Sequence, residues 1–364
     1  MTLEQPKYFG PCPCCVPVLE KSPLSRRRFV AGAVALSAFA ATGSTFASKV
    51  RAQPKPHRID VHHHISPPTW LNAMKNADLD NPPMANWSVQ KTLDDMDKGG
   101  VATAITSPTT PQVTPLEKGD ATRIARQSNE YAKKLMSDHP GRFGVFAMLP
   151  MPHIDESLKE IEYVFDVLKV DGIGVMTSYG DMWLGYAQFG PVWDELNRRK
   201  ATVYTHPTTA NCCVNLVQAI PAPVVEFGAD TTRTIASLLF SGTSQRYKDI
   251  NWIFSHGGGA MTAFAERFQI QMVTTPPFKD KITREIVDGE LKRFYYDTAQ
   301  VSNSVTIGAL AKLVPISQIL YGTDYPYRTA AEHTKGLEAA FSGDDLKAID
   351  RENALRIMPR LRTT

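Results

Sequence analysis

Three consecutive histidines, His62, His63 and His64, stand at the end of an apolar, β-branched run, RIDVHHHI. Successive side chains of a strand point to opposite faces, so His62 and His64 share one face and His63 points the other way. Two imidazoles on one face of a strand end are a natural pair of metal ligands. The pair alone is weak support for a metal site, because histidine is also common in cores and on surfaces.

Polar residues also end three other apolar runs. His206 lies at the end of ATVYTHP, His256 near the end of NWIFSHG, and Asp324 at the end of ISQILYGTD. With the two same-face residues of the triplet, four of the nine histidines occupy such ends. Buried histidine and aspartate need polar partners. Chance is therefore a poor explanation for their presence at the ends of apolar strands. The strand ends together predict a metal site.

Eight short β-rich runs alternate with longer amphipathic segments. This alternation indicates a parallel sheet, and eight units in about 300 residues suit a closed (β/α)₈ barrel. A doubly wound open sheet is the alternative, but no glycine-rich phosphate loop follows the first run. The carboxyl ends of barrel strands are where barrel enzymes keep their active sites. The eight runs begin at Arg58, Val101, Phe143, Val170, Ala201, Asn251, Arg293 and Ile316.

Apolar residues recur at three- and four-residue spacing in residues 120–139 and 154–169, which predicts two helices there. Residues 66–88 and 274–290 are rich in proline or charge, and we expect loops over the barrel at both places. No linker or low-complexity stretch divides the rest. A single domain is therefore expected over residues 53–364.

Residues 1–52 have the composition of a targeting segment. They carry seven basic and two acidic residues, and SRRRFV precedes an uncharged run rich in alanine, glycine and serine. This pattern is typical of a twin-arginine export signal, with Arg26 and Arg27 as the pair. We expect the segment to be cleaved and the protein to be periplasmic or secreted through the twin-arginine export machinery. An uncleaved membrane anchor is the alternative.

The remaining chain has 33 basic and 35 acidic residues. Without a basic excess to neutralise phosphates, a nucleic-acid partner is not expected. Its cysteines are the adjacent pair Cys212 and Cys213. Neighbouring cysteines form a disulfide only with strained geometry, so two free thiols are expected.

The motifs DxHxH, THP, HGGG and GTDYP, in this order and spacing, resemble the amidohydrolase superfamily. More narrowly, they resemble its decarboxylase branch, which contains aminocarboxymuconate semialdehyde, γ-resorcylate and methylsalicylate decarboxylases. The resemblance covers residues 57 to about 358. It implies a distorted barrel of the metal-dependent hydrolase type.

The resemblance implies that His62, His64, His206 and Asp324 bind one divalent metal ion. His256, together with Asp324, would act as acid or base beside it. In the wider superfamily a second metal ion is often held by a modified lysine on the fourth strand. The fourth run here, which begins at Val170, contains no lysine, so a single metal is expected. This ligand set suits zinc best, with manganese and iron as alternatives.

Two arginines are candidates for binding a substrate carboxylate. In aminocarboxymuconate semialdehyde decarboxylase, an arginine eleven residues after the HGGG histidine reaches the neighbouring subunit's site, and Arg267 occupies that position here. A working Arg267 would require a homodimer, whereas a solvated helix arginine is the alternative. Arg233, in DTTRT, is the second candidate.

The function that the resemblance implies is metal-dependent, non-oxidative decarboxylation of a small aromatic or unsaturated carboxylic acid, such as an ortho-hydroxybenzoate. The alternative is a hydrolase of C–O, C–N or C–C bonds that uses metal-activated water. A more distant alternative is an exported metal- or solute-binding protein. The apparent acid or base His256 argues against a pure binding protein.

Overall fold

Eight parallel strands form the barrel, and each lies within one of the runs predicted from the sequence. Neighbouring strands pair in the order β1-β2-β3-β4-β7-β8-β9-β10. The last strand also meets the first, because the amide of Val61 donates to the carbonyl of Tyr321 at 3.0 Å and that of Asp324 to the carbonyl of His62 at 2.8 Å. The predicted (β/α)₈ barrel is therefore confirmed. The barrel strands are β1 (Arg58–His64), β2 (Val101–Ser107), β3 (Phe143–Met148), β4 (Gly172–Met176), β7 (Thr202–His206), β8 (Asn251–Phe254), β9 (Tyr295–Asp297) and β10 (Ile319–Leu320).

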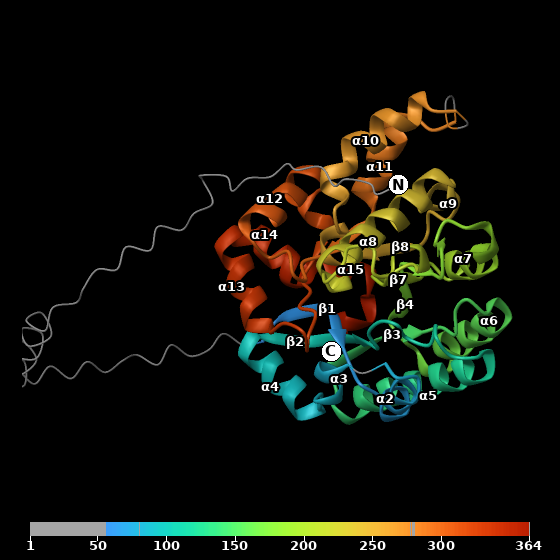
Figure 1. Ribbon diagram of the computed structural model, residues 1–364. Coiled ribbons are helices and arrows are strands. Elements are labelled where there is room, and N and C mark those ends of the chain that lie inside the picture. Colours follow the sequence, from blue (N-terminus) through green and yellow to red (C-terminus); the bar gives the residue numbers. More distant parts are fainter. Residues whose placement is uncertain (1–55, 80, 277, 279–280, 364) are drawn as a thin grey trace, which may run out of the picture. The chain divides into compact units, whose positions relative to one another are not determined.

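The computed structural model describes residues 56–363 except residues 80, 277, 279 and 280 (Figure 1). The predicted export segment, residues 1–52, lies outside the described residues. The described residues cluster as one unit. Within the described part, no helix combines the length and the apolar character that a membrane span requires.

Helices surround the strands (Figure 1). Local sequence explains several of their ends. The side chain of Ser88 accepts a hydrogen bond from the amide of Lys91 at the start of α4, and Gly100, with φ of 70°, ends that helix. The helices are α2 (Pro68–Asn76), α3 (Pro82–Ala85), α4 (Val89–Gly99), α5 (Lys118–Asp138), α6 (Ile154–Tyr163), α7 (Gly190–Arg198), α8 (Ala222–Phe240), α9 (Thr243–Arg246), α10 (Met261–Thr274), α11 (Arg284–Arg293), α12 (Ser304–Leu313), α13 (Ala330–Ala340), α14 (Gly343–Lys347) and α15 (Asn353–Ile357).

The two helices predicted over residues 120–139 and 154–169 are present as α5 and as α6 with a following π-helical turn, Val164–Leu168. The two expected loops are not wholly irregular. Residues 66–88 contain α2 and α3, and α11 begins inside residues 274–290. Prolines at the first turns of α2 and α3 explain the difference, because proline is favoured where a helix begins.

The barrel interior is filled at its amino end by side chains of the strands and of the C-terminal segment. Phe146 and Tyr204 stack with their ring centroids 5.3 Å apart. Met358 and Leu361 pack in the same buried cluster. Thr202 donates to the carbonyl of Ile357 at 3.0 Å, which ties the C-terminal segment to the start of β7. The carboxyl end of the barrel is thus the open end.

Candidate metal centre and active-site cavity

Four side chains converge at the carboxyl end of the barrel. His62 and His64 come from the end of β1, His206 ends β7, and Asp324 follows β10. One potential ligand atom from each lies within 4.8 Å of the others, and all four residues are buried. The four residues that the sequence suggested as metal ligands are therefore brought together.

Hydrogen bonds on the outer ring nitrogens set the direction of all three imidazoles. Nδ1 of His62 lies 2.8 Å from Oδ2 of Asp297. Nδ1 of His64 lies 3.2 Å from the carbonyl oxygen of Ser107, and Nδ1 of His206 lies 2.9 Å from that of Pro207. Because each Nδ1 faces an acceptor, it carries a proton, so Nε2 is the nitrogen that faces the cluster and can bind a metal. This donor set fits one divalent ion.

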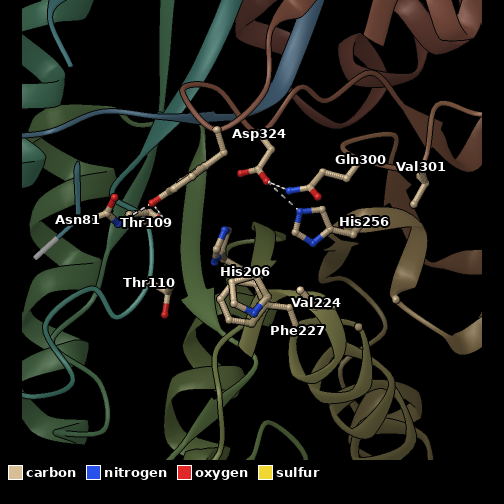
Figure 2. A pocket seen from close by; sticks show the side chains of 14 residues that line it. Asn81, Thr109, Thr110, His206, Val224, Phe227, His256, Gln300, Val301 and Asp324 are labelled. Atoms are coloured by element: carbon tan, nitrogen blue, oxygen red, sulfur yellow. Dashed lines mark hydrogen bonds and ion pairs between the residues drawn. The ribbon is translucent and has the colours of Figure 1, made fainter. Parts of the chain in front are cut away.

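The two oxygens of Asp324 have different neighbours. Oδ1 lies 3.1 Å from Nε2 of His62 and 3.2 Å from Nε2 of His64, so it belongs to the ligand cluster. Oδ2 lies 3.3 Å from Nε2 of His256 and accepts a short hydrogen bond from the side-chain amide of Gln300 (Figure 2). One oxygen is thus available to a metal and the other to a proton.

Burial and neighbouring charges together set the pKa values of the four side chains in the cluster. Burial alone lowers the pKa of His62, but the carboxylates of Asp297 and Asp324 outweigh it and raise the pKa to about 10. Burial acts on Asp324 in the opposite direction, yet the charge of His62 and the three histidine contacts hold its pKa well below the usual range. Burial lowers the pKa of His64 and of His206, which keeps their imidazoles neutral and able to bind a metal.

His63 lies on the opposite face of β1. Its Nδ1 is 2.9 Å from Oδ2 of Asp60, and its ring stacks on Tyr325 with centroids 4.7 Å apart. Asp60 also accepts from the amide and the hydroxyl of Thr323, at 3.1 and 2.6 Å. These contacts fasten β1 to the loop that carries Asp324.

Asp297 was not singled out by the sequence analysis, although it connects two site residues. Its Oδ2 faces His62, and its Oδ1 accepts from the amide of His256 at 2.9 Å. A signal for it exists in the sequence. Asp297 ends the seventh run, RFYYDTA, as His206 and Asp324 end theirs.

His256 follows β8 in a left-handed backbone conformation, with φ of 52°. The next three residues, Gly257 to Gly259, also have positive φ. At Gly259 a Cβ atom would lie 2.2 Å from the carbonyl oxygen of Gly228 in α8, so only glycine fits this contact. The glycines let the chain turn tightly and leave His256 at the cavity.

Gln300 is the second site residue that the sequence did not reveal. It is held in a left-handed conformation with φ of 57°. The backbone amide of Gln300 donates to Nε2 of His333 at 2.8 Å. Nδ1 of His333 donates to the carbonyl of Thr329 at 3.0 Å. His333 therefore connects the start of α13 with the residue that contacts Asp324.

A cavity of about 360 Å³ opens above the cluster, with His206, His256 and Asp324 in its lining. Figure 2 shows Asn81, Thr109 and Thr110 to one side of these three side chains, Val301 beyond His256, and Val224 and Phe227 below His206. The apolar part of the lining comes from α8 and from the loop after β9, and it consists of Pro223, Val224, Phe227 and Val301.

The two candidate arginines are not among the described residues that line this cavity. Arg233 lies 3.3 Å from Glu226 and 4.0 Å from Asp230, and it borders a separate groove between α8 and α10. Arg267 is exposed on α10 and lies in a further depression beside Phe240 and its neighbours. Within this chain neither reaches the cluster, and their roles in substrate binding stay predictions.

Residues 230–233, the DTTR segment, hold the loop beside His256 in place, whereas none of them is among the described residues that line the cavity. Asp230 is fully buried and accepts from Ser178 at 2.8 Å and from the indole of Trp183 at 2.7 Å. Thr232 accepts from the amide of Ala260 at 2.9 Å. The segment thus joins α8 to residues 178–183, which follow β4, and to the glycine loop beside His256.

Residues 59–360 match the amidohydrolase family, Amidohydro_2. The chain belongs to this family. Two curated relatives of this amidohydrolase are decarboxylases by name. Decarboxylase yanB of Aspergillus niger is 34% identical over 83% of this chain and 88% of its own length. The 6-methylsalicylic acid decarboxylase acuB of Aspergillus aculeatus is 32% identical over 84% of this chain and 97% of its own length. The predicted resemblance to the decarboxylase branch is confirmed.

A solved structure supports the barrel independently. The dihydroxybenzoic acid decarboxylase of Polaromonas sp., described with bound manganese and the inhibitor 2-nitroresorcinol, superposes on this amidohydrolase with a TM-score of 0.75. The superposition covers 83% of this chain and 97% of the other, at 21% sequence identity. At this identity the likeness establishes the fold.

Proposed function

We propose that this amidohydrolase is a metal-dependent, non-oxidative decarboxylase of a small hydroxybenzoate-like acid. The observation that carries the proposal is the placement of His256 against Asp324, one of four buried side chains that could hold a metal, at a cavity of about 360 Å³. The names of the relatives support the same activity.

His62, His64, His206 and Asp324 would hold a divalent ion, which would supply positive charge beside the carboxylate of the substrate and against negative charge as it develops. The His256–Asp324 pair holds a proton between Nε2 and Oδ2, which are 3.3 Å apart. That proton passes to the ring carbon that bears the carboxylate. The carbon–carbon bond to the carboxylate then breaks, carbon dioxide leaves, and the electron pair of the bond restores the aromatic ring.

Gln300 has a positioning role in this mechanism. Its amide group donates to Oδ2 of Asp324, the oxygen that His256 also contacts. This donor keeps Oδ2 turned toward His256 while Oδ1 remains in the ligand cluster. The apolar residues of the lining exclude water from the ring, which favours release of the apolar product carbon dioxide.

Zinc is the ion that we propose for the centre. Three imidazoles and one carboxylate form a ligand set that zinc commonly occupies. Manganese is the competing candidate, because a structural neighbour is described with manganese bound. Metal analysis of the purified protein, followed by chelation and reloading with each ion, tests the choice: zinc is expected in the purified protein, and recovery of turnover with manganese alone contradicts it.

The decisive experiment measures carbon dioxide release from a panel of ortho-hydroxybenzoates by the metal-loaded protein. We expect His256→Ala to keep one metal per chain and to lose about 100-fold or more of the turnover. His139→Ala is the matched control, because His139 lies at the end of α5 outside the cavity. Hydrolysis of esters, amides or lactones without carbon dioxide would indicate a hydrolase, and bound metal without either reaction would indicate a binding protein.

We also propose a homodimer that uses α10. Phe264 and Ile270 on this helix are 40% and 46% exposed, and Arg267 lies between them in sequence. Sedimentation of the wild type and of Phe264→Glu tests the dimer, with Val305→Glu on α12 as the control. A monomeric wild type would contradict the proposal.

Mixing two inactive variants tests whether Arg267 serves the neighbouring site. If it does, subunits carrying His256→Ala and subunits carrying Arg267→Ala restore about one quarter of wild-type activity when mixed, since one site in each mixed dimer is complete. Full activity of Arg267→Ala alone would show that the arginine does not bind the substrate.

Export through the twin-arginine route remains a proposal of its own, supported by the SRRRFV segment and the run that follows it. We expect the full-length protein to reach the periplasm of a competent host. Replacement of Arg26 and Arg27 by lysine should leave it in the cytoplasm. A cytoplasmic location with both arginines intact would contradict the proposal.

A further inference from the structure

Two thiols in the segment between β7 and α8 are in contact. Cys212 and Cys213 end a short 3₁₀ turn, Asn211–Cys213, and their Sγ atoms lie 2.7 Å apart. Both are free thiols, as the sequence predicts. Cys212 is exposed, whereas Cys213 is buried and lines a small cavity of about 110 Å³ within the same segment. An accessible thiol next to a resolving cysteine is the arrangement typical of redox-sensing pairs.

The turn lies between two parts of the active site. His206 ends β7 before the turn, and Pro223 and Val224 of α8 follow it; all three line the active-site cavity. Phe227 in the same helix packs edge-to-face on His206, with ring centroids 6.3 Å apart. The segment that carries the two cysteines is thus connected at both ends to residues of the cavity lining.

Backbone hydrogen bonds hold the reduced turn in place. The amide of Cys212 donates to Oδ1 of Asp181, in residues 178–183, at 2.7 Å. The amide of Cys213 donates to the carbonyl of Ala210 at 2.9 Å. A disulfide between adjacent cysteines closes a small ring that contains the peptide bond between them, and this ring strains the backbone. Because the amide of Cys213 belongs to that peptide bond, oxidation disturbs the hydrogen bond that closes the turn.

We propose that Cys212 and Cys213 are a redox modification site, which a small-molecule disulfide oxidises to a Cys212–Cys213 disulfide that slows turnover. Cys212 attacks one sulfur of the small disulfide, forms a mixed disulfide and releases one thiol. Cys213 then attacks the sulfur of Cys212, forms the bond between the two residues and releases the second thiol. The cysteines are oxidised, the small disulfide is reduced, and the protons of the two cysteine thiols pass to the released thiols.

The chemical setting makes this oxidation slow at neutral pH and easily reversed. The hydrogen bond to Cys213 and the carboxylate of Asp181 raise the pKa of the Cys212 thiol to about 11, so little of the attacking thiolate is present at neutral pH. Strain in the small ring makes the disulfide easy for other thiols to reduce. Oxidation is therefore expected under strongly oxidising conditions and is faster at alkaline pH.

Mass spectrometry of the oxidised full chain tests the thiol chemistry. Trypsin releases residues 201–233 as one peptide, which holds these two cysteines and no other. After treatment with oxidised glutathione at alkaline pH, we expect this peptide to be lighter by the two thiol hydrogens and to resist alkylation until it is reduced. An unmodified peptide, or a glutathione adduct that persists in the wild type, would overturn the proposal.

Two single variants separate the attacking thiol from the resolving thiol. In Cys213→Ser the glutathione adduct of Cys212 should persist, because no resolving thiol remains. In Cys212→Ser the buried Cys213 should stay unmodified under the same treatment. Adducts that form equally on both variants would contradict the assigned order of attack.

Turnover and hydrogen exchange test the consequence of the disulfide, and the turnover effect rests on the proposed decarboxylase function. We expect oxidation of the wild type to lower kcat for ortho-hydroxybenzoates by about 10-fold and dithiothreitol to restore it. The double variant Cys212→Ser, Cys213→Ser should turn over like the reduced wild type and not respond to the oxidant. Backbone amides in residues 207–214 should exchange faster in the oxidised wild type, whether or not any acid is decarboxylated.

These measurements distinguish failure of the redox site from failure of the proposed function. A disulfide with faster exchange, but no carbon dioxide from any acid in the reduced protein, would mean that the decarboxylase function fails and the modification site stands. A disulfide that leaves kcat of an active protein unchanged, a disulfide without faster exchange, or an equal effect of the oxidant on the double variant would overturn the regulatory role.

Discussion

The three adjacent histidines of β1 have different tasks because strand geometry sends them to different faces. His62 and His64 point to the cluster, and His63 pairs with Asp60 and stacks on Tyr325. We expect His62→Ala to lose stoichiometric metal. His63→Ala should keep one metal per chain while losing about 2 kcal/mol of unfolding free energy, because it removes a buried hydrogen bond and a ring contact.

Metal analysis together with thermal unfolding of both variants checks this prediction. Loss of the metal from His63→Ala in a folded protein would show that the division of the triplet is wrong.

Asp297 is predicted to act through His62. Asp297→Asn keeps the shape of the side chain but removes the charge that orients Nδ1 of His62, so metal affinity should fall by about 10- to 100-fold. Competition with a chelator of known affinity measures the change. Asp350→Asn is the control, since it alters an equally buried carboxylate that pairs with Arg58 far from the site.

The sequence predicted some site residues and missed others for a physical reason. A polar residue at the end of an apolar strand can be recognised from the sequence alone. This rule located His206, His256 and Asp324. The same rule, applied to the seventh run, would also have found Asp297. Gln300 obeys no such pattern, because its position depends on a left-handed backbone and on His333, a partner from a different helix.

At the scale of elements, α8 holds the glycine loop in place. The hydroxyl of Thr232 accepts from Ala260, whereas that of the adjacent Thr231 donates only to Phe227 within its own helix at 3.0 Å. Thr232→Val should therefore lower kcat by about 10-fold through misplacement of His256, with metal content unchanged. Thr231→Val should leave kcat close to that of the wild type. Equal kcat values for the two variants would contradict this role of α8.

Helix α7 carries a pH-dependent contribution to stability. Hydrogen bonds from Arg198 and Arg199 lower the pKa of Glu195 from 4.5 to about 2. A depressed carboxyl pKa stabilises the fold above pH 4.5, and this contribution disappears as the pH falls toward 2.

Glu195→Gln should therefore be about 1 kcal/mol less stable than the wild type at neutral pH. The difference should shrink as the pH falls from 4.5 toward 2. Urea unfolding across this range, with the exposed Glu266→Gln as the control, measures it. A constant difference at every pH would show that the ion pairs do not contribute as described.

For the whole molecule, the alternation of eight strands with helices was sufficient to predict the barrel. The site followed from it, since the carboxyl ends of parallel strands meet at one rim. The packing of Met358 and Leu361 in the buried cluster of the barrel interior could not be predicted, because no local sequence pattern shows that a C-terminal segment will cover one end of a barrel. Proline is frequent in loops, so its abundance in residues 66–88 predicts a loop there, whereas Pro68 and Pro82 begin helices α2 and α3.

Decarboxylation at the carboxyl end of the barrel, with a proton supplied to the ring carbon that bears the carboxylate, is the reaction that we propose. Its most direct test is turnover of 2-hydroxy-6-methylbenzoate by the metal-loaded protein in deuterium oxide, with carbon dioxide and the ring product quantified together. We predict one carbon dioxide for each phenol formed and one deuterium at the carbon that carried the carboxylate. Consumption of the acid without carbon dioxide, or no reaction by a protein with its metal bound, would contradict it.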